Sequence, residues 1–238
     1  MSLGWNFSGV AIFCQYPNGI PKIRGTGKVF PTRFSPPTSS ALPTEVFRSD
    51  RICSRYIHLK DRQCTLVFTD GACLNNGMPN PRAGWGIVYG PGHRDGGPEI
   101  ECGRLENKGP FGDDGIQSSN RAELRAVIAA LRVRNWPGEG LNTIVIATDS
   151  TYVVDGSTKW AKTWIKNDWK TGVGADVKNR DLWEMLLGEA ERWEDRGLLI
   201  QFWKIPRDWN SAADAAAKEG ALKEEVTDYS VRPERMCF

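Results

Sequence analysis

The chain contains 238 residues, of which 40% are hydrophobic, 25% charged and 10% aromatic, and its formal net charge is +2. Its 10 Trp and 9 Phe can bury a large core, which excludes whole-chain disorder. No run of about 18 apolar residues exists, which excludes a membrane-spanning helix. We therefore expect one large domain, or one domain with an appendage.

The first 60 residues differ from the rest of the chain. They carry eight basic and two acidic residues, and six prolines between Pro17 and Pro43 interrupt any helix. The stretch 35–43 has the composition of a linker. Such a basic arm is either a tether to a polyanion or a solvated or packed leader. We expect an N-terminal extension over 1–62, a catalytic domain over 63–222 and a C-terminal tail over 223–238.

Ordered elements begin near residue 63. The hydrophobic patterns predict three strands, at 64–70, 84–90 and 99–105, and then a helix that begins at Ser118 or Ser119 and ends before Pro137 and Gly138. A fourth strand at 143–148, one or two short helices over 150–167, a helix over 179–193, a fifth strand at 198–205 and a helix over 210–222 follow. This order predicts an α/β fold with a five-stranded mixed sheet flanked by helices.

Zinc and redox chemistry are not favoured. The six cysteines form no CxxC pair, and the chain has only two histidines. Scattered cysteines suit free thiols in a reducing compartment. Cys73 has no adjacent histidine that would activate it as a nucleophile.

Four carboxylates are candidates for chemistry. Asp70 and Asp149 directly follow apolar strands, and Glu123 and Asp214 lie one turn into helices. If they converge, their mutual repulsion requires cations, and oxygen ligands suit Mg²⁺ or Mn²⁺. Two such ions are a standard device for phosphoryl displacement. The alternative is that each carboxylate belongs to an exposed turn or helix cap.

Four segments, in this order, resemble type 1 ribonuclease H. They are 68–77 (FTDGACLNNG), 119–126 (SNRAELRA), 147–153 (ATDSTYV) and 210–218 (NSAADAAAK), and the resemblance covers about 63–222. It implies a ribonuclease H-like fold and an endoribonuclease that cuts the RNA strand of RNA–DNA hybrids, leaving a 3′-hydroxyl and a 5′-phosphate. It also implies two Mg²⁺ ions, for which Mn²⁺ can substitute.

The resemblance assigns roles to particular residues. The implied metal-binding and catalytic carboxylates are Asp70, Glu123, Asp149 and Asp214. The implied contacts with RNA are Gly71, Cys73, Asn76 and Ser150. The implied contacts with DNA are Ser118, Trp160, Thr171 and Asn179. Trp160 belongs to a segment, 159–171, that interleaves three Trp with four Lys. For Trp164 and Trp169 the alternative is simple packing.

Two departures from the family pattern stand out. The loop 204–210 (KIPRDWN) is short and lacks the histidine that many members carry, as in a eukaryotic or fungal-type variant. Arg207 is the candidate to replace it, although an arginine cannot act as a general base. The arginine position of the DNA-phosphate pocket is occupied by Ile116.

Other interpretations remain open. One is a catalytically silent nucleic-acid-binding module of the same fold, which would predict the loss of a metal carboxylate. Another is a ribonuclease H domain cut from a retroelement polymerase. We expect an RNA–DNA hybrid as partner, no membrane and no obligate protein partner. We expect the nucleus or cytoplasm; mitochondrial targeting is favoured by the lack of acidic residues before Glu45 and opposed by the lack of basic ones before Lys22.

Overall fold

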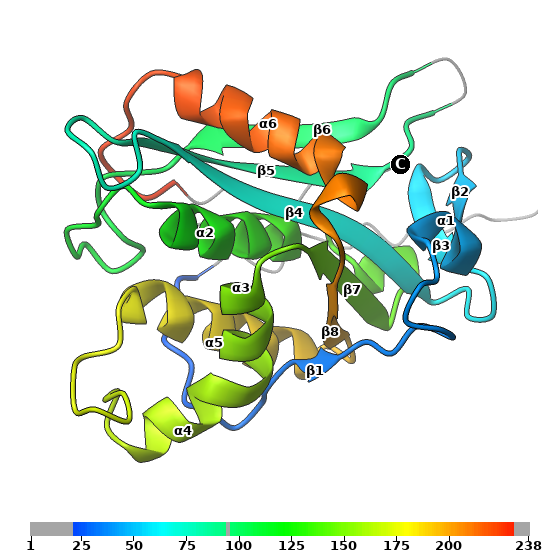
Figure 1. Cartoon of the computed structure of the whole chain (residues 1–238). Coiled ribbons are helices and arrows are strands. Elements are labelled where there is room, and N and C mark those ends of the chain that lie inside the picture. Colours follow the sequence, from blue (N-terminus) through cyan, green and yellow to red (C-terminus); the bar gives the residue numbers. More distant parts are fainter. Residues whose placement is uncertain (1–20, 94–95, 231–238) are drawn as a thin grey trace, which may run out of the picture.

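A computed structural model describes residues 21–93 and 96–230 (Figure 1). Its strands are β1 (Thr32–Arg33), β2 (Phe47–Asp50), β3 (Arg55–His58), β4 (Cys64–Leu74), β5 (Arg82–Gly90), β6 (Glu99–Arg104), β7 (Thr143–Thr148) and β8 (Leu199–Lys204). Its helices are α1 (Pro43–Val46), α2 (Ser119–Arg132), η1 (Pro137–Glu139), α3 (Thr151–Asp155), η2 (Gly156–Trp160), α4 (Ala161–Lys166), α5 (Arg180–Glu194), η3 (Arg207–Trp209) and α6 (Ser211–Leu222).

The strands form one mixed sheet of eight strands, in the order β1-β8-β7-β4-β3-β2, with β5 paired to β4 and β6 paired to β5. β4, β7, β8 and β1 are parallel, whereas β5, β6, β3 and β2 pair antiparallel. Strands β4 to β8 are the five that the sequence predicts, and the α/β class with helices on the sheet is confirmed. The other three strands belong to the N-terminal extension, where strands of two to four residues leave no periodic signal.

Strand β4 is longer than the sequence indicates. The apolar run ends at Asp70, and we expected a turn there, but the strand continues to Leu74. It continues because β5 pairs with it from Phe68↔Val88 to Leu74↔Arg82. Asp70 therefore lies inside a strand rather than at its end.

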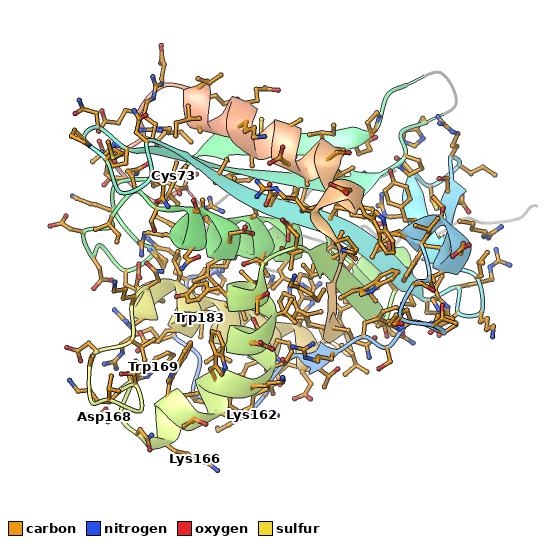
Figure 2. The ribbon with its side chains drawn as sticks, in the orientation of Figure 1. Cys73, Lys162, Lys166, Asp168, Trp169 and Trp183 are labelled. Atoms are coloured by element: carbon orange, nitrogen blue, oxygen red, sulfur yellow. The ribbon has the colours of Figure 1, made fainter. Side chains whose placement is uncertain are left out.

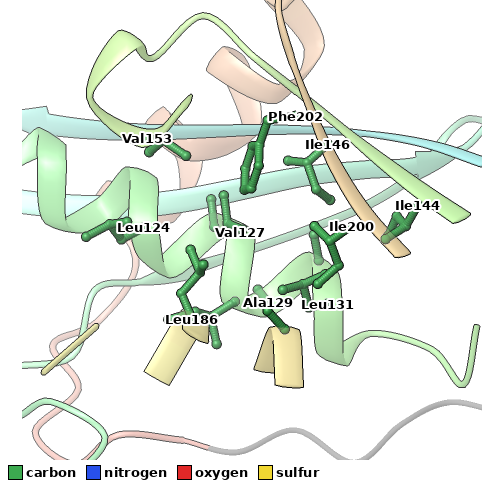
Figure 3. Close-up of a cluster of buried hydrophobic side chains, with 14 of the residues drawn as sticks. Leu124, Val127, Ala129, Leu131, Ile144, Ile146, Val153, Leu186, Ile200 and Phe202 are labelled. Carbon is green, nitrogen blue, oxygen red and sulfur yellow. The ribbon is translucent and has the colours of Figure 1, made fainter. Parts of the chain in front are cut away.

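The main core lies between the sheet and helices α2 and α5. Ile144 and Ile146 alternate along β7 with residues of the other face, and they pack with Val127 of α2 and Phe202 of β8 (Figure 3). The side chains of all four are almost fully buried. This packing fixes the position of α2 relative to strands β7 and β8.

The opposite sheet face is covered in two parts. Helix α6 lies over β4, β5 and β6 (Figure 1). The helix can approach the sheet closely because Gly86 has no side chain; a Cβ on Gly86 would lie only 2.5 Å from the backbone nitrogen of Ala217. Over β7 and β8 the cover comes from the N-terminal extension, whose Phe47 packs with Val145 and Trp203. The described part of the extension is thus built into the core. Among the described residues, no helix is long and apolar enough to cross a membrane.

Candidate active site

The candidate site lies where strands β4 and β7 separate. The two strands pair in parallel as far as Phe68↔Ala147. Asp70 and Asp149 each lie two residues beyond that pair, so their carboxylates face each other at the point of divergence. Oxygens of Asp70, Asp149 and Glu123 all lie within 4.8 Å of one another. Of the four carboxylates that the sequence predicts to converge, these three lie within that distance of one another.

Glu123 reaches the cluster from the first turns of α2. The helix begins after Ser118, whose hydroxyl accepts a hydrogen bond from the amide of Arg121. The helix can pack closely against β4 because Gly71 has no side chain. A Cβ at this position would lie 2.1 Å from the backbone nitrogen of Glu123. Gly71 is therefore needed to bring Glu123 to Asp70.

Asp149 is held by a residue that the sequence did not single out. The side-chain amide of Asn210 donates to Asp149 Oδ1 at 3.1 Å and to the carbonyl oxygen of Thr69 at 3.0 Å. Asn210 is only 1% exposed, so these bonds are shielded from water. Its position four residues before Asp214 was visible in the motif 210–218, but the spacing did not reveal that its amide faces Asp149.

Asp214 lies beside the cluster, in the first turn of α6. Lys218, one turn further along the helix, has its Nζ 2.6 Å from Asp214 Oδ2. Nη2 of Arg207 lies 3.4 Å from Asp214 Oδ1, and its Nε lies 4.0 Å from Asp149 Oδ2. Arg207, although 75% exposed, thus spans two of the four carboxylates.

Burial, together with the crowding of negative charge, raises the pKa values of two acids in the cluster. Burial and the nearby carboxylate of Asp149 raise the pKa of Asp70 to about 6. Burial, followed by the charges of Asp70 and Asp149, raises the pKa of Glu123 well above its usual value. The hydrogen bond to Asp214 and the charge of Asp149 raise the pKa of Arg207, which stays cationic.

The cluster fits divalent cations. Oε2 of Glu123 is buried and has no hydrogen-bond partner among the described residues. A buried carboxylate oxygen without a partner costs free energy, which a cation would recover. The donors are all oxygens, the set preferred by Mg²⁺ and Mn²⁺. Asp70, Glu123 and Asp149 are therefore able to hold metal, with Asp214 adjacent.

The residues expected to contact RNA lie in the last part of β4, in the turn after it and at the N-cap of α3. Cys73 is half-buried near the end of β4, and burial raises the pKa of its thiol, which opposes a nucleophilic role. Asn76 lies exposed in the turn after β4. The hydroxyl of Ser150 accepts a hydrogen bond from the amide of Val153, so it caps α3 beside Asp149.

Two of the residues expected to contact DNA, Ser118 and Asn179, directly precede α2 and α5. An ion pair of 2.6 Å between Arg121 and Asp181 joins the first turns of these helices. The side-chain amide of Asn179 donates to the hydroxyl of Tyr152. Thr171 lies in a separate loop, where its hydroxyl accepts a hydrogen bond from the amide of Ala175.

Trp160 projects from the segment α3–η2–α4, residues 151–166, which we call the protrusion. Its ring lies 6.4 Å from that of Tyr152 and is 38% exposed. Trp169 (Figure 2) is buried and Trp164 is half-buried, and both pack with the main core. Tyr152 connects Trp160 to Asn179, a link that the sequence did not predict.

Ile116, which stands at the arginine position of the DNA-phosphate pocket in the family pattern, is 65% exposed.

Comparison with known proteins gives consistent results. Residues 62–222 match the family model described as RNase H. Ribonuclease H1 of Homo sapiens is 35% identical over 165 residues, which cover 67% of this chain and 51% of that protein. Ribonuclease H of Hyphomonas neptunium is 35% identical over 162 residues, which cover 68% of this chain and 95% of that protein. The chain spans about half the length of the mammalian relatives it matches.

A solved structure is also similar. It is the crystal structure of LC9-RNase H1, described as a type 1 RNase H with the type 2 active-site motif. The sequence identity is 26%, the TM-score is 0.47, and the match covers 67% of this chain and 72% of that chain.

Proposed function

Because this chain belongs to the RNase H family, whose model matches residues 62–222, we propose that it is an endoribonuclease that hydrolyses the RNA strand of RNA–DNA hybrids. The observation that carries the proposal is the cluster of Asp70, Glu123 and Asp149, with oxygens within 4.8 Å of one another. The proposed products have a 3′-hydroxyl and a 5′-phosphate.

The proposed cofactor is a pair of Mg²⁺ ions, for which Mn²⁺ can substitute. Asp70, Glu123, Asp149 and Asp214 would hold them. Bound divalent ions supply positive charge for the phosphate and lower the pKa of water. The all-oxygen donor set and the unpartnered Oε2 of Glu123 support this assignment.

The chain's own residues orient and balance the cluster. The buried amide of Asn210 fixes the direction of Asp149, as supporting residues do for many metal ligands. Arg207 adds a positive charge that does not titrate near neutral pH, where a histidine would. We propose that it stabilises charge at a phosphate and takes no proton.

Recognition of the hybrid is assigned to two surfaces. Gly71, Cys73, Asn76 and Ser150 are the proposed contacts with RNA, and Glu123 would accept a hydrogen bond from a ribose 2′-hydroxyl, which DNA lacks. Ser118, Trp160, Thr171 and Asn179 are the proposed contacts with the DNA strand. The exposed ring of Trp160 supports this assignment, because stacking and cationic contacts suit a nucleic-acid strand.

The domain boundaries are also part of the proposal. Residues 63–222 would carry the chemistry, while 223–238 would be a tail and residues 1–62 an extension. The four cysteines that the structure describes are free thiols, which supports a location in the nucleus or cytoplasm.

A cleavage assay tests the activity. The full chain is incubated with a hybrid labelled on the RNA strand, in Mg²⁺ or in excess EDTA. We expect internal cuts in Mg²⁺ and none in EDTA. Cleavage that persists in EDTA, or that removes nucleotides only from the ends, would contradict the proposal.

A further inference from the structure

The segment from Pro21 to Phe34, which we call the strap, lies against the outside of the catalytic fold. Figure 1 shows it in dark blue, passing from α5 toward the protrusion and ending at β1. Its first described residue is already fixed, because the buried side chain of Arg132 donates to the carbonyl oxygen of Pro21 at 2.7 Å. The strap therefore has specific contacts along its length.

The closest contact joins two glycines. A Cβ on Gly25 would lie 2.4 Å from the backbone nitrogen of Gly188, and a Cβ on Gly188 would lie 2.1 Å from the carbonyl oxygen of Ile23. Gly188 lies inside α5, where glycine weakens a helix relative to alanine. The absence of a side chain at this position is explained by the passage of the strap.

A carboxylate of α5 then holds the strap by its backbone. Oε1 of Glu191 accepts hydrogen bonds from the amide of Thr26 at 2.8 Å, from its hydroxyl at 2.9 Å and from the amide of Lys28 at 3.0 Å. Hydrogen bonds to a charged acceptor are stronger than neutral ones. Glu191 thus fixes the strap just before it reaches the protrusion.

The far end of the strap contacts the protrusion at three points. Gly27 adopts a φ of +77°, and a Cβ there would lie 2.4 Å from the Cδ1 atom of Ile165. Nζ of Lys162 lies 5.3 Å from the ring centre of Phe30. Arg33 forms an ion pair with Asp155 of α3.

These contacts connect to the proposed DNA-binding tryptophan. Lys162 (Figure 2) and Ile165 lie on α4, the helix that also carries Trp164. The ring of Trp164 lies 5.9 Å from that of Trp160 and 5.3 Å from that of Trp183, which belongs to α5. The strap supports α4 on one side, and the aromatic contacts connect it to α5 on the other.

We propose that the strap positions the protrusion, so that Trp160 and the lysines of α4 meet the hybrid in a fixed orientation. The strap reaches the protrusion and α5, and its role is in binding rather than in the chemical step. This inference rests on the proposed function, because it assigns the strap a part in binding that same hybrid. A loosened protrusion would lose conformational entropy on binding, which weakens affinity.

The test uses Glu191→Ala in the full chain. Its matched control is Glu194→Ala, which removes the same charge from the same helix; the Glu194 side chain is exposed and forms no hydrogen bond or ion pair with any described residue. Hydrogen exchange of the α4 amides, the dissociation constant of the hybrid in Ca²⁺ and the single-turnover rate at saturating hybrid are measured. For Glu191→Ala we expect faster exchange in α4, binding weakened on the order of threefold to tenfold, and an unchanged saturated rate.

Glu191→Gln distinguishes positioning from a general loss of stability. Its amide oxygen can still accept the bonds that reach Oε1, so we expect it to restore most of the exchange protection and affinity. Gly188→Ala is a second test, because the two possible effects change the melting temperature in opposite directions. Helix propensity alone would raise the melting temperature, whereas a clash of the new Cβ with the strap would lower it, which is the result we expect.

The role of the strap and the proposed function fail on different results. Equal affinity and equal α4 exchange in Glu191→Ala and Glu194→Ala would overturn the role of the strap, as would a higher melting temperature of Gly188→Ala. A failure of the wild-type chain to bind the hybrid in Ca²⁺ would overturn the proposed function itself.

Discussion

Asp70 combines the position of a proposed metal ligand with an unfavourable environment for its charge. Because its pKa in the folded state is raised to about 6, from a usual value of 3.8, the folded state binds more protons than the unfolded state between these values. The free energy of unfolding of the metal-free protein therefore falls as pH rises through this window, and the loss is complete above it.

Replacement of Asp70 by Asn should have opposite effects on activity and stability. We expect no Mg²⁺-dependent cleavage, because the cluster loses a ligand. The metal-free variant should be more stable than wild type by about 1–3 kcal/mol at neutral pH, and its stability should depend less on pH between 4 and 6. Hybrid cleavage and urea unfolding in EDTA check both effects. Cleavage at a wild-type rate would remove Asp70 from the mechanism.

Asn210 should act through Asp149. Asn210→Ala leaves the Asp149 carboxylate without its buried donor, so we expect a loss of about 10- to 100-fold in activity or in metal affinity. A Mg²⁺ titration of the initial rate measures it. A variant with the same Mg²⁺ dependence and rate as wild type would show that the hydrogen bond does not matter to the site.

Arg207 should contribute charge without titrating. Arg207→Ala should lower turnover by roughly tenfold, less than the loss of a buried donor, because the side chain is 75% exposed. Arg207→Lys should restore part of the rate, and hybrid binding in Ca²⁺ should change less than turnover. Single-turnover rates decide the matter: cleavage by Arg207→Ala at the wild-type rate would exclude a catalytic role.

At the scale of elements, the N-terminal extension supplies one wall of the core. Phe47 of β2 is 3% exposed, and its ring lies 6.2 Å from that of Trp203 in β8. Phe47→Ala should therefore lower the free energy of unfolding by about 3–5 kcal/mol, as for a central core residue. Urea denaturation measures the change. A value near zero would mean that the extension separates from the catalytic fold before it unfolds.

The sequence predicted elements with strong periodicity better than those held by distant partners. α2, α5 and the apolar strands β7 and β8 were recognisable, because their patterns repeat over many residues. The two residues of β1 carry no such pattern, and they become a strand only because Gln201 and Phe202 offer an open edge. The continuation of β4 past Asp70 likewise depends on β5.

The same distinction applies to the site. The sequence singled out four carboxylates from their expected positions in the elements and from the family motifs, and three of them lie together in the structure. The links through Asn210 and Tyr152 were not, because a hydrogen bond between residues 61 apart depends on how the elements pack. Arg207 was a candidate from its loop, but its approach to both Asp149 and Asp214 required the structure.

At the scale of the whole molecule, the prediction concerns the choice among duplexes. Duplex DNA lacks the 2′-hydroxyl that would donate a hydrogen bond to Glu123, and duplex RNA lacks a deformable deoxyribose strand. Both should be cut at least roughly 10²-fold more slowly than the hybrid. Parallel assays with one sequence in all three forms measure the ratio. Equal rates would indicate a general nuclease.

Strand β1 also has a consequence for self-association. Without it, β8 would offer unpaired N–H and C=O groups to a strand from another molecule. β1 occupies this edge at Gln201 and Phe202, and it is itself only two residues long. Pro31, directly before it, and Pro36 and Pro37, shortly after it, have no N–H to donate to a further strand. The chain thus closes its own sheet edge with a segment that resists extension into polymers.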